Sequence, residues 1–123
     1  MLKILLAEDD ALLSSILVTT LKHAGFDVHA SADGFEAELE IKTWHPDLVL
    51  LDLMMPNEDG FGVLRNIRSD TETFKTHVIV LSNLSEAKTI DEVKKFGVNE
   101  YFIKANTTPS DLVKKLKVLF PEA

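Results

Sequence analysis

The feature that most constrains the fold is a fivefold alternation between short apolar runs and segments of helical periodicity. The apolar runs cover residues 2–7, 28–30, 48–51, 78–81 and 101–103. The helical segments cover residues 11–24, 35–44, roughly 60–68, 86–96 and the stretch after Thr108, a capping hydroxyl followed by proline. The buried-looking runs do not alternate between apolar and polar residues, which indicates a parallel sheet covered on both faces. Right-handed connections then predict an α/β doubly wound sandwich of the (βα)5 type.

Composition narrows the class of protein. A chain of 123 residues fits one domain, and 46% hydrophobic with 27% charged residues is typical of a globular protein rather than a disordered one. The apolar runs are too short to span a bilayer, and the acids directly after the first run argue against a signal peptide. The chain has no cysteine, which excludes disulfides and thiolate chemistry. Together these features predict a cytoplasmic location.

The chain is acidic, with a formal net charge of -7. It therefore lacks the basic surface that a nucleic acid or an anionic membrane would require, and we expect neither as a direct partner. Most of this negative charge is explained by solubility, but an excess of acidic residues also suits a site that binds divalent cations.

Polar and charged residues directly follow four of the five expected strands. They are Glu8, Asp9 and Asp10 after the first strand, Asp52 after the third, Ser82 and Asn83 after the fourth, and Lys104 after the fifth. The carboxyl ends of parallel strands meet at one edge of the sheet, and neighbouring strands lie about 5 Å apart. These side chains are therefore expected to meet in one pocket.

The residue types in this expected pocket suit phosphoryl chemistry. Carboxylates that lie close together repel each other and require a cation, and oxygen ligands without histidine or cysteine favour Mg²⁺. A lysine and a hydroxyl on the other side of the pocket could bind further phosphate oxygens. A central carboxylate such as Asp52 can attack phosphorus and form an acyl phosphate.

Four motifs, "ILLAEDD", "LVLLDLMMPNEDGF", "VIVLSN" and "YFIKA", occur in this order along the chain. With them the chain resembles a response regulator receiver domain of two-component signalling over essentially its whole length, residues 1–123. The resemblance implies a flavodoxin-like fold whose five parallel strands have the order 2-1-3-4-5.

The resemblance also implies roles for the acidic residues. Asp52 corresponds to the phospho-acceptor. Glu8 and Asp9 correspond to the acidic pair that holds Mg²⁺, or Mn²⁺ in its place, together with Asp52 and the backbone carbonyl of Met54. Asp10 is expected to cap the helix that follows.

Three further residues match positions with roles in the family. Ser82 and Lys104 would each bond an oxygen of the phosphoryl group. Tyr101 would be the aromatic switch residue, which turns inward when Ser82 is drawn to the phosphoryl group.

By this resemblance the protein is a signalling module, not an enzyme with a separate substrate, and it catalyses only its own phosphorylation and dephosphorylation. The phosphoryl group would come from a sensor histidine kinase or a phosphotransfer protein. Output would pass to a downstream protein through the fourth and fifth helices and the last strand, from a monomer or a phosphorylation-dependent dimer. Because the chain ends at "LFPEA", soon after the last helix, we expect a stand-alone receiver without an output domain.

Two positions depart from the family pattern. Ala105 stands where the family usually has a proline with a cis bond after the lysine, and Asn83 stands where a small residue often follows the hydroxyl. A cis bond to a non-proline residue costs about 2.5–4 kcal/mol. Either the site holds that strain or the loop takes a different path.

Two apolar residues bear on the lifetime of the phosphoryl group. In this family the residues two beyond the acceptor and two beyond the hydroxyl flank that group, and here they are Met54 and Leu84. Neither side chain can orient an attacking water. We therefore hypothesise slow self-dephosphorylation relative to receivers with polar groups at these positions.

Simpler interpretations exist for single residues. The acids at 8–10 could merely favour a helix N-terminus, by about 0.3–1 kcal/mol each. Lys104 could be a strand-end lysine whose ammonium reaches water, and Tyr101 a half-buried strand tyrosine.

Other functions compete with the receiver interpretation. A phosphatase of the haloacid-dehalogenase type would need a second acid where Met54 stands, and a flavin carrier would need a hydroxyl- and glycine-rich loop where "EDDALLSS" stands. A receiver that has lost phosphorylation and acts only as a binding surface is a further alternative, for which Asn83 and Ala105 leave room.

Overall fold

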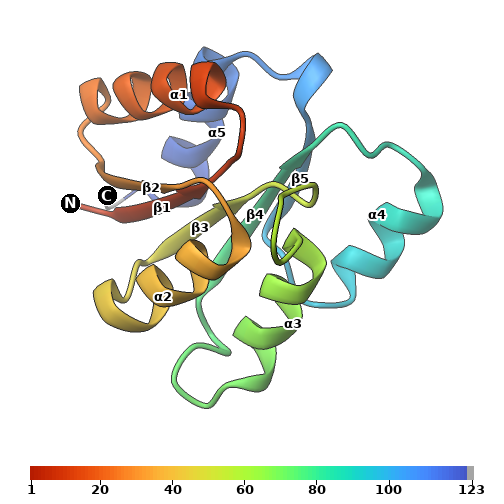
Figure 1. Cartoon of the computed structure of the whole chain (residues 1–123). Helices are drawn as coiled ribbons and strands as arrows, with labels where there is room; N and C mark the ends of the chain where they lie inside the picture. The colour runs from red at the N-terminus through yellow and green to blue at the C-terminus, as the bar shows by residue number, and fades with distance from the viewer. Residues whose placement is uncertain (122–123) are drawn as a thin grey trace.

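Five strands form one parallel sheet in the computed structural model, which describes residues 1–121 (Figure 1). The strands are β1 (Lys3–Ala7), β2 (Asp27–Ser31), β3 (Leu48–Leu51), β4 (His77–Ser82) and β5 (Glu100–Ile103). Their order across the sheet is β2-β1-β3-β4-β5, and all four neighbouring pairs are parallel. The expected flavodoxin-like (βα)5 fold with the order 2-1-3-4-5 is therefore confirmed.

Helices cover both faces of this sheet. They are α1 (Ala11–His23), α2 (Gly34–Trp44), α3 (Gly60–Ser69), α4 (Ala87–Lys94) and α5 (Pro109–Leu119), and a 3₁₀ turn, η1 (Lys104–Asn106), follows β5. Helices α1 and α5 lie side by side on one face, and α2, α3 and α4 lie on the other (Figure 1). Helix α4 is shorter than the segment 86–96 expected from its periodicity, because the chain leaves the helix at Lys95 and turns at Gly97, whose φ is +73°.

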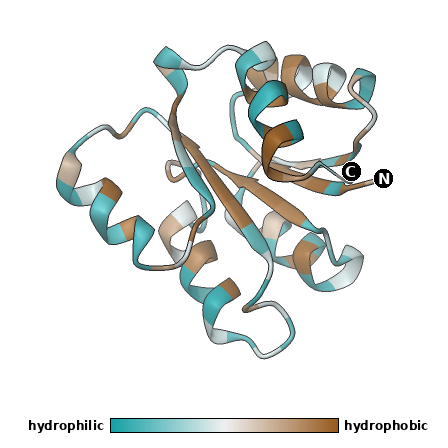
Figure 2. Cartoon of the chain, turned by 180° about the vertical axis from the view of Figure 1, so that it is seen from behind, coloured by the Kyte–Doolittle hydropathy of each residue, from teal (hydrophilic) through white to brown (hydrophobic). Residues whose placement is uncertain are grey.

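Two hydrophobic cores separate the sheet from its helices. Along β3, Leu48 and Leu50 belong to the core under α1 and α5, whereas Val49 and Leu51 belong to the core under α2, α3 and α4. Successive side chains of a strand point to opposite faces, so a strand buried on both sides is apolar at every position. Figure 2 shows these hydrophobic strands at the centre and helices with hydrophilic stretches around them.

Four of the five α-helices begin at a side chain that caps their free backbone N–H groups. These caps are Asp10 for α1, Asp33 for α2, Asp59 for α3 and Thr108 for α5. The capping expected for Asp10 is confirmed, since its Oδ1 accepts from the Leu13 amide at 3.1 Å. Helix α4 lacks such a cap within the described residues. Over residues 1–121 no helix combines the length and the apolar character needed to cross a membrane.

Candidate functional site

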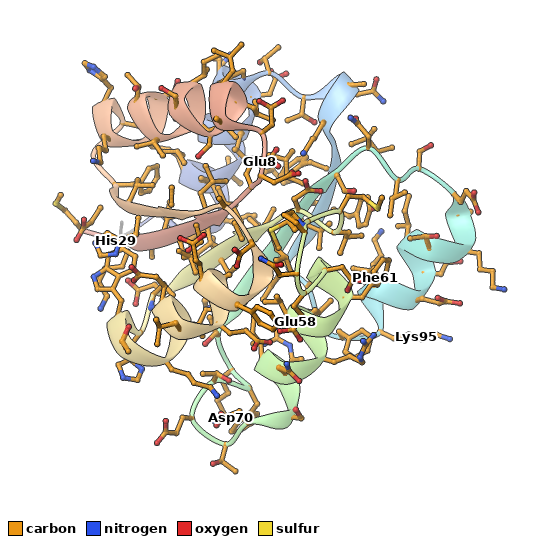
Figure 3. The ribbon with its side chains drawn as sticks, viewed as in Figure 1. Glu8, His29, Glu58, Phe61, Asp70 and Lys95 are labelled. Atoms are coloured by element: carbon orange, nitrogen blue, oxygen red, sulfur yellow. The ribbon has the colours of Figure 1, made fainter. Side chains whose placement is uncertain are left out.

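The polar residues that follow the strands lie together at the carboxyl edge of the sheet. Glu8 and Asp52 directly follow two neighbouring interior strands, β1 and β3, and are only 3% and 4% exposed. Ser82 ends β4 and is fully buried, whereas Asp9 is exposed. Figure 3 shows Glu8 at the carboxyl end of β1, below the first turn of α1, and Asp70 at the far end of the molecule.

Three carboxylates form a compact cluster at this edge. Glu8, Asp9 and Asp52 each offer one oxygen atom, and these atoms all lie within 4.8 Å of one another. The Oε2 atom of Glu8 is buried and accepts no hydrogen bond from any described residue. A buried carboxylate oxygen without a partner is costly, and oxygen ligands at this spacing suit a hard divalent cation. The residues present therefore fit a metal ion of the Mg²⁺ type.

Lys104 reaches this cluster from the opposite side. Its Nζ atom donates a hydrogen bond to Asp52 Oδ2 at 2.9 Å and a second one to Glu8 Oε1. Burial lowers the pKa of Lys104, but its hydrogen bonds to Glu8 and Asp52 outweigh burial and raise the pKa above its usual value. One ammonium group thus faces three acids, which leaves an excess of negative charge for a cation to neutralise.

The environment of Glu8 disfavours its ionised form. Burial, followed by the hydrogen bond and the charge repulsion from Asp52, raises the pKa of Glu8 to about 7 despite the neighbouring Lys104. A pKa displaced this far by burial and a like charge is typical of functional sites, and a bound cation would favour the carboxylate again.

The backbone around Asp52 holds its carboxylate in place. The Asp52 amide donates to the Ala7 carbonyl at 3.0 Å, which continues the pairing of β1 with β3, and Oδ1 accepts from the Met54 amide at 3.2 Å. Gly60, the first residue of α3, packs against this turn. A Cβ atom at Gly60 would lie 2.2 Å from the Asp52 carbonyl oxygen, so any other residue would displace one of the two segments.

Ser82 and Tyr101 contact the same short segment after β4. The Leu84 amide donates to Ser82 Oγ at 3.3 Å, and the Tyr101 hydroxyl donates to the Leu84 carbonyl at 2.6 Å. Burial raises the pKa of Tyr101 above its usual value. The half-buried Tyr101 side chain is therefore bonded to the loop that directly follows Ser82.

The two departures from the family pattern contact each other. Asn83 Oδ1 accepts a hydrogen bond from the Ala105 amide at 3.1 Å. Ala105 lies in the 3₁₀ turn that starts at Lys104, and residues 1–121 contain no cis peptide bond. Of the two possibilities raised by the sequence, the loop takes the different path. Sequence reasoning missed this contact, although both residues directly follow site residues of neighbouring strands.

Met54 is placed differently from the buried acids. Its side chain is 60% exposed on the loop after β3, while its amide contacts Asp52. The role expected for its carbonyl as a metal ligand stays a prediction.

Comparison with known proteins agrees with this geometry. The chain matches the family described as "Response regulator receiver domain" over residues 4–117. It is 36% identical to the "Probable transcriptional regulator ycf27" of Porphyridium aerugineum over 94% of this chain and 46% of that protein. The receiver domain of the Francisella response regulator 1452 superposes with a TM-score of 0.89 at 30% identity, covering 99% of this chain and 98% of that one.

A second solved structure is the BeF3-activated N-terminal receiver domain of Klebsiella pneumoniae RstA. It gives a TM-score of 0.84 at 29% identity and covers 94% of this chain and 96% of that one. The chain spans about half the length of the curated relatives that it matches. On the family match and these likenesses, the chain belongs to the response regulator receiver domain family of two-component signalling.

Proposed function

We propose that this receiver accepts a phosphoryl group on Asp52 in a reaction that depends on Mg²⁺. One observation carries the proposal: the buried Asp52 carboxylate lies within 4.8 Å of the Glu8 and Asp9 oxygens and receives a hydrogen bond from Lys104 at 2.9 Å. A carboxylate held between acids and a lysine has the surroundings that a phosphoryl acceptor requires.

In the proposed transfer, a carboxylate oxygen of Asp52 attacks the phosphorus of a phosphohistidine on a sensor kinase or phosphotransfer protein. The new P–O bond forms as the P–N bond breaks, and the electron pair of that bond returns to the histidine nitrogen, which then takes a proton from solvent. The pairing of β3 with β1 restrains the approach of Asp52, because its amide donates to the Ala7 carbonyl at the end of β1.

Glu8, Asp9 and Asp52 would hold Mg²⁺, or Mn²⁺ in its place, with the Met54 carbonyl as a further ligand. A bound divalent cation neutralises charge that develops on the phosphoryl oxygens. The unpartnered Glu8 Oε2 supports this assignment, because a buried carboxylate oxygen gains most from a cation.

Lys104 and Ser82 would bind the remaining phosphoryl oxygens. In the resting state Lys104 bonds Asp52 directly, so its ammonium needs only a small movement to follow the transferred group. Ser82 Oγ accepts from the Leu84 amide, which leaves its hydroxyl proton free to donate.

The signal would leave through the surface formed by α4, β5 and α5. Tyr101 supports this route because it belongs to β5 and bonds the Leu84 carbonyl, two residues from Ser82. A displacement of Ser82 toward a phosphoryl group would move that carbonyl and release or redirect the Tyr101 ring.

The partners in this proposal are proteins. A net charge of -7 disfavours direct contact with DNA, so we assign the output to a downstream protein rather than to a nucleic acid. Residues 1–123 are proposed to form this one receiver domain, which acts as a signalling module without a separate substrate. Its cytoplasmic location and its state as a monomer or a phosphorylation-dependent dimer stay predictions.

The direct test uses the intact chain with acetyl phosphate and Mg²⁺, followed by mass measurement of the whole protein. We expect one added phosphoryl group, which Asp52→Asn abolishes. Asp59→Asn is the matched control, because asparagine caps a helix about as well as aspartate and residue 59 lies outside the carboxylate cluster. Absence of an adduct on the unaltered chain would overturn the proposal and favour a receiver that acts only as a binding surface.

A further inference from the structure

The hydrogen bond between Asn83 and Ala105 joins the loop that follows Ser82 to the turn that begins at Lys104. Asn83 directly follows Ser82, and Ala105 directly follows Lys104, so the 3.1 Å bond connects the nearest neighbours of two proposed phosphoryl-binding residues. It lies beyond the end of the sheet, since the backbone pairing of β4 with β5 stops at Ser82 and Ile103. The Asn83 side chain thus extends the connection between the strands after the regular ladder has ended.

The acceptor from Asn83 meets a specific need of the 3₁₀ turn. The first N–H groups of any helical turn have no partner inside the turn, and Ala105 is the second residue of η1. The residue that precedes η1, Ile103, provides no side-chain cap. Asn83 therefore caps the turn from a neighbouring strand, and this contact needs a backbone N–H at position 105, which a proline would lack.

The capped turn is the base from which Lys104 reaches the acids. Lys104 is the first residue of η1, and its ammonium bonds Asp52 and Glu8, which directly follow β3 and β1. The loop on the Ser82 side is held independently, because Tyr101 bonds the Leu84 carbonyl at 2.6 Å. These two hydrogen bonds hold the segment after Ser82 and the turn that begins at Lys104 in a defined relation to each other.

We infer that Asn83 is a positioning residue for phosphoryl transfer, acting through the backbone of Lys104. This inference rests on the proposed function. Removal of the Asn83 acceptor loosens the turn and lets the Lys104 ammonium depart from the geometry of the transition state. A small misplacement of this kind can lower a rate by up to about a hundredfold, and we expect a loss of about tenfold or more in the maximal rate of phosphorylation.

The role of Asn83 differs from that of the carboxylates in one measurable respect. Glu8, Asp9 and Asp52 follow β1 and β3, which Asn83 does not contact through any hydrogen bond among the described residues. Loss of the Asn83 acceptor should therefore not weaken the affinity for Mg²⁺, although the maximal rate falls. A substitution that merely disturbed the fold of the site would weaken both.

The experiment compares Asn83→Leu with Ser85→Leu, which places the same side chain at an exposed position in the same loop. The maximal rate and half-saturation concentration with acetyl phosphate are measured beside Mg²⁺ binding by calorimetry. We expect Asn83→Leu to lower the maximal rate with the Mg²⁺ affinity intact, and Ser85→Leu to change neither. An unchanged rate in Asn83→Leu, or an equal loss in Ser85→Leu, would overturn the inference.

A second variant removes the other half of the contact. Ala105→Pro deletes the donor, so Asn83→Leu should lower the rate less in the Ala105→Pro background than in the unaltered chain. Additive losses would show that the two residues act separately and would contradict the inference.

Amide hydrogen exchange at Ala105 separates this inference from the proposed function. The Ala105 amide should exchange slowly in the unaltered chain and faster in Asn83→Leu, whether or not the protein is phosphorylated. If acetyl phosphate leaves the unaltered chain unmodified, the proposed function fails although the exchange difference persists. If exchange at Ala105 is the same in both proteins, the hydrogen bond to Asn83 is absent, and the inference fails while the proposed function stands.

Discussion

The ammonium nitrogen of Lys104 lies 2.9 Å from Asp52 Oδ2, although the two residues are separated by 52 positions in the chain. Lys104 begins the turn that follows the edge strand β5, whereas Asp52 directly follows the central strand β3. The same ammonium group also bonds Glu8, so the Lys104 side chain links the carboxyl ends of β1, β3 and β5. This arrangement makes Lys104 the main internal counter-charge of the site.

Replacement of Lys104 by methionine should destabilise the metal-free protein. Hydrogen bonds to charged groups contribute about 1.5–3 kcal/mol, and both acids would remain buried without their cation. Lys115→Met is the matched control, because Lys115 forms a solvent-exposed pair with Glu100 at 3.4 Å and should cost about 1 kcal/mol or less. Urea unfolding in the presence of a chelator measures both, and equal losses would contradict the assignment.

The stability of the metal-free protein should fall as the pH rises from about 4.5 to about 7. The folded protein raises the pKa of Glu8 from its usual 4.5 to about 7, so the folded state binds the Glu8 proton more tightly than the unfolded state does. The stability that this proton contributes is complete below the usual pKa and is lost as the pH rises through the raised one. In Glu8→Gln the free energy of unfolding, measured at several pH values, should vary less with pH over this range. The same pH dependence in Glu8→Gln and the unaltered chain would contradict the prediction.

Removal of divalent cations should lower the melting temperature at neutral pH. Mg²⁺ at a hundred times its dissociation constant stabilises the folded state by about 2.7 kcal/mol if it binds that state alone. Asp9→Asn should weaken this effect without unfolding the chain, since Asp9 is exposed. Asp10→Asn is the matched control, because asparagine preserves the cap of α1 and residue 10 lies outside the cluster. Thermal scans with Mg²⁺ and with chelator would show a loss confined to Asp9→Asn.

Gly60→Ala should destabilise the protein far more than Gly62→Ala. At Gly60 the new Cβ would lie 2.2 Å from the Asp52 carbonyl oxygen. The backbone of Asp52 would have to move to relieve this clash, and its carboxylate would move with it. At Gly62 the nearest atom is the end of the Glu58 side chain, which can rotate away. Overpacking against backbone costs about 1–3 kcal/mol, whereas alanine is a better helix former than glycine. The denaturant midpoints of the two variants measure this difference in stability. Similar midpoints would show that the turn after β3 can adjust to the added methyl group.

The phosphorylated protein should lose its phosphoryl group faster after Met54→Asn. Met54 is 60% exposed beside Asp52, and its apolar side chain cannot orient an attacking water. An amide supplies both a donor and an acceptor for that water, so the lifetime should shorten several-fold. Met54→Leu preserves the apolar character and should leave the lifetime close to that of the unaltered chain. Phosphate release from the Mg²⁺-bound phosphoprotein is the measurement, and an equal lifetime for both variants would reject the hypothesis.

Much of the fold follows from local patterns in the sequence. Uninterrupted apolar runs such as Leu48–Leu51 predict strands buried on both faces, and the structure places their side chains alternately in two cores. Caps such as Asp10 and Thr108 were also predictable, because a cap acts within a single turn of its own helix. The end of α4 was predicted only to within two residues: Gly97 turns the chain, as a glycine that follows a helix does, but the helix already ends at Lys94.

The candidate site divides in the same way. Local patterns predicted which residues stand at the carboxyl edge, because a parallel sheet brings all strand ends to one side and the acids, Ser82 and Lys104 directly follow those strands. Which of these side chains touch follows from the packing of the whole chain: Lys104 bonds both Glu8 and Asp52, and Asn83 caps the turn at Ala105. The physical reason is that strand periodicity fixes the backbone position of a residue, whereas hydrogen bonds between distant residues depend on side-chain reach, burial and the paths of loops that no local pattern encodes.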